Sequence, residues 1–176
     1  AARLGLTSSF LGWVGADQNG EVCRRTFEKE GVDTSLLTLE RGKNTNYHYV
    51  LWYESERTIL VKHESYSYVF PRLKNPPRFV YLSSLAQNSI PYQKAIAKYV
   101  WENPETLLAF QPGTFQMKMG TTELREVYAN TYIFFCNKEE AQRILSTTQD
   151  DAKALLKGLR ALGPKIAVMT DGRKGA

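Results

Sequence analysis

The sequence contains few of the residues from which proteins build disulfide frameworks or metal sites: it has two cysteines and two histidines in 176 residues. Cys23 and Cys136 stand far apart, so we expect two reduced, buried thiols and a cytoplasmic protein. His48 and His63 are isolated from each other and match no metal-ligand spacing, which argues against a zinc site. No apolar run approaches the length of a membrane span, and we therefore expect no membrane partner.

The chain also lacks a concentrated basic region, although its net charge is +5. Its basic residues are scattered over residues 24–25, 72–78, 153–165 and 173–174. Nucleic-acid-binding proteins gather such residues into a patch or stripe, and ssDNA-binding grooves add aromatic side chains on which bases stack. We therefore expect no nucleic-acid partner, whereas a small polyanion such as a nucleotide would suit this surface.

Short apolar runs alternate with helical patterns over most of the chain. Strands are predicted at residues 8–14, 79–82, 106–110, 132–136 and 165–169, and helices at 21–30, 92–102, near 122–128 and at 151–162. Strands that alternate with helices form parallel sheets through right-handed crossovers. The pattern predicts an α/β protein with a three-layer αβα core and a mostly parallel sheet.

One segment breaks this rhythm. Residues 36–40, 45–54 and 58–63 are strand-like, with tight connections and no helix between them. In the middle run both faces carry aromatic or apolar side chains, so neither is plainly a solvent face. We predict a small antiparallel β lid at residues 36–63 beside a core of residues 1–35 and 64–176. Its aromatic rings either cover a ligand or serve ordinary sheet packing.

Residues 131–141 place polar side chains directly after a buried strand. Asn137 stands at the N-cap position of a helix, and Glu140 follows three residues later, which is the spacing of a capping box. The same position is where open α/β sheets bind ligands, beside the N-termini of helices. Both interpretations can hold together.

Several motifs together resemble the ribokinase-like (PfkB) family of carbohydrate kinases. They are ARLG at 2–5, GWVGADQNG at 12–20, EGVDTS at 30–35, FQPG at 110–113, NKEE at 137–140 and TDGRKGA at 170–176. The similarity covers nearly the whole chain in order. The segment at 36–63 falls where that family carries its substrate lid.

The resemblance implies ATP and Mg²⁺ as cofactors. The N-x-x-E motif assigns Mg²⁺ and phosphate organisation to Asn137 and Glu140, with Glu140 reaching the metal through water. Thr170, Gly172 and Gly175 match the loop beside the nucleotide, where glycines permit close backbone approach.

The resemblance also implies substrate contacts and an assembly. Gln111, which stands where the family has Asn or Asp, and His48 on the lid are the candidate substrate-binding residues. A homodimer formed through the lid is a further expectation.

Two motifs of the family have no counterpart in these residues: the glycine-pair substrate motif and the G-A-G-D motif that carries the general-base Asp. We therefore expect the base beyond residue 176, an incomplete core, and no phosphoryl transfer by residues 1–176 alone. The predicted function is ATP-dependent phosphorylation of a sugar or nucleoside hydroxyl. The alternative is a non-catalytic binding or assembly module with the same fold.

Overall fold

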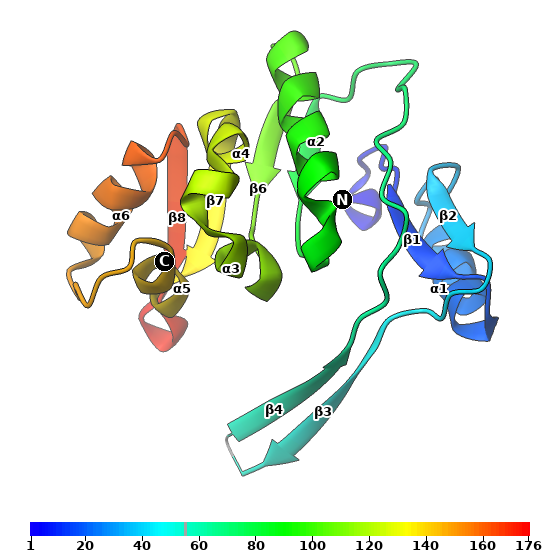
Figure 1. Ribbon diagram of the computed structural model, residues 1–176, viewed down its shortest axis with the longest axis horizontal. Coiled ribbons are helices and arrows are strands. Elements are labelled where there is room, and N and C mark those ends of the chain that lie inside the picture. Colours follow the sequence, from blue (N-terminus) through cyan, green and yellow to red (C-terminus); the bar gives the residue numbers. More distant parts are fainter. Residues whose placement is uncertain (55) are drawn as a thin grey trace. The chain divides into compact units, whose positions relative to one another are not determined.

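The computed structural model describes residues 1–54 and 56–176, except for the side chains of Glu56, Arg57, Val61 and Lys174. The described chain forms two compact units, Ala1–Pro71 and Arg72–Ala176 (Figure 1). None of the helices in the described residues combines the length and the apolar character needed to cross a bilayer.

The first unit is built on a short parallel strand pair. After the 3₁₀ turn η1 (Ala2–Leu4), β1 (Gly12–Gly15) leads into α1 (Gln18–Lys29), and β2 (Leu37–Glu40) returns beside β1 in parallel register. Asp17 caps α1 by accepting a 2.8 Å hydrogen bond from the backbone N–H of Gly20. This cap explains why the helix begins three residues before the predicted start at residue 21.

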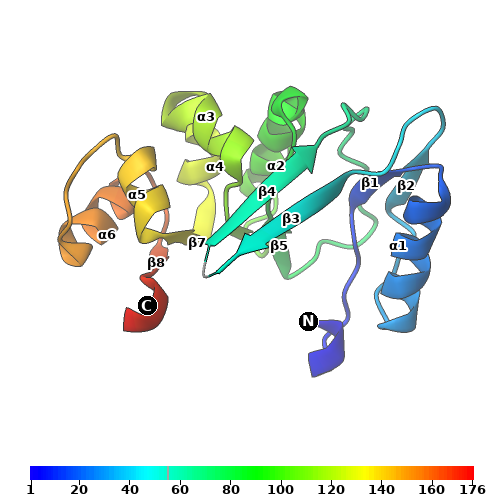
Figure 2. The ribbon, with the colours of Figure 1, turned by 90° about the horizontal axis from the view of Figure 1, so that it is seen from below.

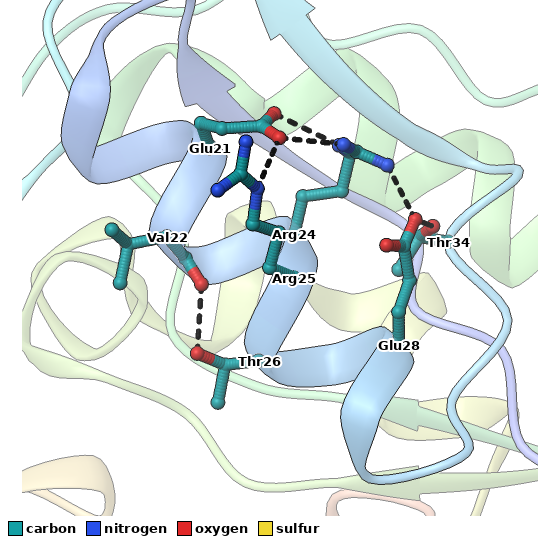
Figure 3. A network of polar contacts seen from close by, with 7 residues as sticks. All are labelled: Glu21, Val22, Arg24, Arg25, Thr26, Glu28 and Thr34. Atoms are coloured by element: carbon teal, nitrogen blue, oxygen red, sulfur yellow. Dashed lines mark hydrogen bonds and ion pairs between the residues drawn. The ribbon is translucent and has the colours of Figure 1, made fainter.

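The outer side of α1 carries a chain of charged contacts. Arg24 pairs with Glu21 at 2.6 Å and with Glu28 at 2.5 Å, and Arg25 also pairs with Glu21, at 2.8 Å. Thr34 donates a 3.0 Å hydrogen bond to Glu28 and so joins the network from the loop after the helix (Figure 3). These i,i+3 and i,i+4 pairs support the helix modestly, because their side chains are exposed or half-exposed to solvent.

A two-stranded antiparallel hairpin follows, formed by β3 (Tyr47–Tyr53) and β4 (Glu56–Lys62), in register from Tyr47↔Lys62 to Tyr53↔Glu56. Every residue of β3 is exposed, so both faces of this strand meet solvent within the first unit. The prediction that residues 36–40 belong to the antiparallel meander is wrong, because Leu37–Glu40 pairs in parallel with β1. Helix α1 supplies the crossover that a parallel pair requires. The division into a core and a lid at residues 36–63 stays a prediction.

The second unit holds a four-stranded parallel sheet in the order β5-β6-β7-β8. Its strands are β5 (Phe79–Leu82), β6 (Leu107–Phe110), β7 (Thr131–Asn137) and β8 (Ile166–Thr170). Its helices are α2 (Ile90–Glu102), α3 (Thr114–Glu123), α4 (Arg125–Ala129), α5 (Lys138–Ile144) and α6 (Ala152–Ala161), with the 3₁₀ turns η2 (Gln87–Ser89) and η3 (Gly172–Lys174). The parallel sheet and the α/β class are confirmed.

The helices α2–α6 lie on one face of this sheet (Figure 2). Right-handed crossovers between neighbouring strands that follow chain order place their helices on the same side. The unit therefore provides the sheet and one helical layer of the predicted arrangement. Between sheet and helices, Phe110, Tyr128 and Phe134 are buried with ring centroids 5.4–5.6 Å apart. Such aromatic clusters contribute large buried apolar area.

Helix α3 occupies residues 114–123, for most of which the sequence analysis predicted no helix. Gly120, at φ 83°, interrupts its helical geometry. A glycine adopts this left-handed conformation without a steric penalty. The predicted helix near residues 122–128 corresponds to the end of α3 and to most of α4.

Candidate active site

Three strands of the second unit deliver predicted site residues to the same edge of the sheet. β7 ends at Asn137 and β8 at Thr170, and these two residues are direct partners in the parallel register. Gln111 follows β6, the neighbour of β7 on its other side. Figure 1 shows the arrowheads of β6, β7 and β8 directed toward one edge. Since ligands bind at the carboxyl ends of strands in open α/β sheets, this edge is the candidate active site.

Asn137 and Glu140 form a reciprocal capping box at the start of α5. The Asn137 side-chain oxygen accepts from the backbone N–H of Glu140 at 2.8 Å, and Glu140 Oε2 accepts from the backbone N–H of Asn137 at 2.8 Å. The capping prediction is confirmed. The box also holds the Glu140 carboxylate in one position at the strand end, as a ligand-binding role would require.

The buried thiol beside this box is chemically quiet. Cys136 is 3% exposed, and burial, followed by the nearby charge of Glu140, raises its pKa to about 12. Nucleophilic cysteines need a lowered pKa and some exposure, so this residue serves as a packing side chain.

The loop after β8 turns back on itself within six residues. The backbone N–H of Asp171 donates to the carbonyl oxygen of Gly175 at 2.8 Å, across the 3₁₀ turn η3. Gly172 and Gly175 have φ values of 55° and 96°. Residues that carry a Cβ rarely adopt these positive φ values, so the backbone geometry favours glycine at both positions. The loop begins next to Asn137, because Thr170, the last residue of β8, is the register partner of Asn137.

The sequence analysis did not single out Lys138, a cation at the same edge. Its ammonium lies 2.6 Å from Asp150, and its side chain is only 17% exposed. The hydrogen bond to Asp150, then the charges of Asp150, Asp171 and Asp151, raise the pKa of Lys138 above its ordinary value against the opposing effect of burial. Lys138 therefore stays protonated between the loop after β8 and the loop before α6. The position of Lys138 inside the NKEE motif was the sequence feature from which it could have been identified.

His48 belongs to the other unit, on β3, and its ring lies 5.9 Å from that of His63 in an edge-to-face arrangement. The expectation that the two histidines are isolated from each other is therefore wrong. The hairpin register sets them diagonally across the two strands. Burial, followed by the charge of His48, lowers the pKa of His63.

A family model described as pfkB family carbohydrate kinase matches residues 1–176. The chain belongs to the pfkB family. The resemblance predicted from the six motifs is thus confirmed.

Two curated relatives match 99% of the chain. An uncharacterized sugar kinase of Archaeoglobus fulgidus is 23% identical, and a nucleoside kinase of Methanothermobacter thermautotrophicus is 24% identical. The chain covers 70% of the first protein and 56% of the second.

Solved structures show the same fold. The fructokinase of Vibrio cholerae O395, bound to fructose, ADP and calcium, superposes with a TM-score of 0.77 at 20% identity. A putative ribokinase II from E. coli, in its apo form, superposes with a TM-score of 0.79 at 16% identity. Each comparison covers 99% of this chain and 60% of the solved chain. The ribokinase-like fold is confirmed.

A buried amide network fixes two strand-end loops of this pfkB-family sheet. Gln116 Oε1 accepts from the backbone N–H of Gly113 at 2.8 Å, while its Nε2 donates to Ser83 O and Gln93 Oε1, both at 3.0 Å. Gln93 donates in turn to Ser89 Oγ at 2.9 Å. Gln116, Gln93 and Ser89 are all fully buried. The loops after β5 and β6 are therefore joined by satisfied polar contacts, which rigidify a protein core.

The candidate substrate residue Gln111 lies on this fixed support. Its backbone N–H donates to Leu82 O at 2.9 Å, and its side-chain oxygen accepts from the hydroxyl of Tyr81. A Cβ on Gly113 would lie 2.1 Å from Ser84 Oγ, so only glycine permits this approach of the two loops. The sequence analysis missed the network, because Gly113 has no side chain that could complete a capping box with Gln116.

Proposed function

We propose that the protein phosphorylates a hydroxyl group of a sugar or nucleoside with ATP. The observation that carries this proposal is the pairing of Asn137 with Thr170, which sets the N-x-x-E motif beside the glycine-containing loop at one sheet edge. Relatives described as a sugar kinase and a nucleoside kinase support the reaction class. The fructose and ADP in the V. cholerae structure support the pairing of a sugar with a nucleotide.

ATP would bind along the loop of residues 170–175. The glycines at 172 and 175 leave its backbone open, and no heavy atom lies within 4 Å of a Cβ built on either one. Backbone N–H groups in such turns attract phosphate. Lys138, which is paired with Asp150, is the cation at this edge. We assign nucleotide binding to Thr170, Gly172 and Gly175 on these grounds.

The residues present fit Mg²⁺. Among the described residues, no three His, Cys, Asp or Glu side chains are grouped so that they could hold a metal. Mg²⁺ can bind without such a cage, because it keeps several waters and takes one or two carboxylates with phosphate oxygens. Glu140, fixed by its hydrogen bond to Asn137, offers that carboxylate. When bound, the ion would neutralise phosphate charge.

The β3–β4 hairpin would cover the substrate, with His48 and Gln111 as contacts. Its exposed aromatic side chains include Tyr49 and Tyr53 on one face of β3, at 62% and 77% exposure, and Trp52 on the other face, at 66%. Exposed apolar surface of this kind marks ligand-binding or protein-interaction sites. We propose that the same hairpin also forms a homodimer contact. Cys23 and Cys136 are both free, which is consistent with the proposed cytoplasmic location. The prediction that both thiols are buried holds for Cys136 and is wrong for Cys23, which is half-exposed.

The test is ADP release by the full-length protein with Mg²⁺-ATP and a panel of pentoses, hexoses and nucleosides. The assay uses the full-length protein because the chain covers 70% and 56% of its two curated relatives. Glu140→Gln keeps an oxygen that can cap Asn137 but removes the charge. Glu139→Gln, an exposed neighbour outside the capping box, is the matched control.

We expect substrate-dependent turnover in the wild type and in Glu139→Gln. Glu140→Gln should need several-fold more Mg²⁺ for its half-maximal rate and retain nearly the wild-type unfolding midpoint. Equal Mg²⁺ dependence of the two variants would return Glu140 to a capping role alone. Binding of nucleotide without ADP release for any substrate would favour the non-catalytic module.

A further inference from the structure

The motif GADQNG at residues 15–20 has no part in the proposed chemistry, yet it packs against the chain that leads into the hairpin. We infer that Gly15, Asp17 and Gly20 form a seat for Thr45, and that Asp17 is thereby a positioning residue for the lid. This inference rests on the proposed function only where it concerns substrate binding. The seat itself lies within the first unit.

Asp17 makes more contacts than a helix cap needs. Its Oδ1 accepts from Gly20 N at 2.8 Å, which is the capping bond, and also from the hydroxyl of Thr45 at 2.6 Å. Its Oδ2 accepts from Thr45 N at 2.8 Å. These contacts, led by the Thr45 hydroxyl, lower the pKa of Asp17 to about 2. The ionised carboxylate thus binds both the backbone and the side chain of a residue 28 positions away.

The two glycines explain the spacing of the motif. A Cβ on Gly15 would lie 2.4 Å from Lys43 O and 2.5 Å from Thr45 N, and a Cβ on Gly20 would lie 2.0 Å from Gly15 O. Gly15 N also donates to the Thr45 hydroxyl at 3.0 Å. Backbone therefore packs directly on backbone here: a side chain at Gly15 would push residues 43–45 away, and one at Gly20 would displace Gly15, which binds Thr45.

The seat lies at the root of the hairpin. Thr45 is 5% exposed, and β3 begins two residues later at Tyr47. On the other side of the root, Glu64 N donates to Asn46 Oδ1 at 2.6 Å and the Tyr66 hydroxyl donates to Asn44 O at 2.7 Å. Because every residue of β3 is exposed, contacts at the root set the direction of the hairpin.

The variant Asp17→Asn distinguishes the contact with Thr45 from the capping of α1. The asparagine oxygen can still accept from Gly20 N, but its NH₂ group would face the Thr45 N–H, donor against donor. Thr45→Val removes the hydroxyl and Thr45→Ser retains it. Asp151→Asn is the matched control, because Asp151 caps α6 through Ala154 N at 2.7 Å in the other unit.

The experiment measures hydrogen exchange in the full-length protein at Glu64, on the far side of the root, and along α1. Losing charge-assisted hydrogen bonds should accelerate exchange at Glu64 about tenfold or more in Asp17→Asn and Thr45→Val. Thr45→Ser should stay within about twofold of wild type. The α1 amides of Asp17→Asn should be unchanged, and Asp151→Asn should leave Glu64 unchanged. Faster exchange along α1 with Glu64 unaffected would reduce Asp17 to a helix cap and overturn the seat.

Kinetics then test the positioning role. We expect Asp17→Asn and Thr45→Val to raise KM for the phosphoryl acceptor several-fold, with KM for ATP nearly unchanged and Thr45→Ser restoring wild-type values. An unchanged acceptor KM, in variants whose root exchanges faster, would overturn the positioning role. A wild type without phosphoryl transfer would refute the proposed function instead. The hydrogen-exchange experiment would still test whether Asp17 holds Thr45. If Asp17→Asn does not fold, the comparison of Thr45→Val with Thr45→Ser tests the same inference.

Discussion

Replacing Gln116 by methionine should destabilise the second unit, because this amide closes the network beneath the candidate substrate loop. The change keeps the approximate length of the side chain and removes three hydrogen bonds, to Gly113, Ser83 and Gln93. Each is worth about 1 kcal/mol net, and an unpaired buried acceptor costs about 1–3 kcal/mol more. Gln93 Oε1 becomes such an acceptor, since Gln93 is fully buried. Part of this loss is offset by burying an apolar side chain, so we expect a decrease of about 2–4 kcal/mol.

The assay is equilibrium urea unfolding of the full-length protein, with the m-value checked for constancy. Gln142→Met is the control, because Gln142 makes one hydrogen bond at the surface, to Gln149 O at 2.8 Å. We expect the control to change the free energy of unfolding by less than about 1 kcal/mol. A loss below about 0.5 kcal/mol in Gln116→Met, similar to the control, would refute the role assigned to the network.

Three further predictions concern single residues. The pKa of Asp17 is lowered to about 2, against about 3.9 in an unfolded chain, so its stabilisation is fully present above pH 4 and is lost as pH falls toward 2. The difference in Tm between wild type and Asp17→Asn should therefore shrink between pH 5 and pH 2.5 on thermal scans, and a difference that grows would contradict the hydrogen bonds described. Gly113→Ala should cost about 1–3 kcal/mol in urea unfolding, because its Cβ would meet Ser84 Oγ at 2.1 Å; an unchanged midpoint would show that the loops can separate. Cys136 should resist iodoacetamide at pH 8 while half-exposed Cys23 reacts, as peptide mass spectrometry would show; the reverse order would mean that the β7 end is open.

Helices, strands and caps that depend on residues close together in the sequence were predicted from local sequence patterns. β5 was predicted with its observed bounds because its apolar run lies between polar segments. The Asn137–Glu140 capping box was predicted because three-residue spacing determines both of its hydrogen bonds. Helix α3 was missed because its buried residue is the polar Gln116, which leaves no apolar stripe for a periodicity search to find.

These local patterns could not predict contacts between residues that are far apart in the sequence. The run at residues 37–40 reads as a strand, but its sequence does not say that its partner is β1, in parallel. The His48–His63 pair depends on the hairpin register. The Asp17–Thr45 bonds join residues 28 positions apart, so the sequence motif was visible while its partner was not.

We propose that the carboxyl ends of β7 and β8 bind a metal–nucleotide complex. Mn²⁺ takes the same carboxylate and phosphate ligands as Mg²⁺ and broadens NMR signals of nearby nuclei. The decisive measurement is the loss of backbone amide signals in the full-length protein on adding Mn²⁺-ATP. We predict losses at Asn137, Glu140 and residues 170–175, with Thr131 retained, since it begins β7 about 20 Å away. Broadening centred on Thr131, or none at the strand ends at saturating nucleotide, would contradict the account.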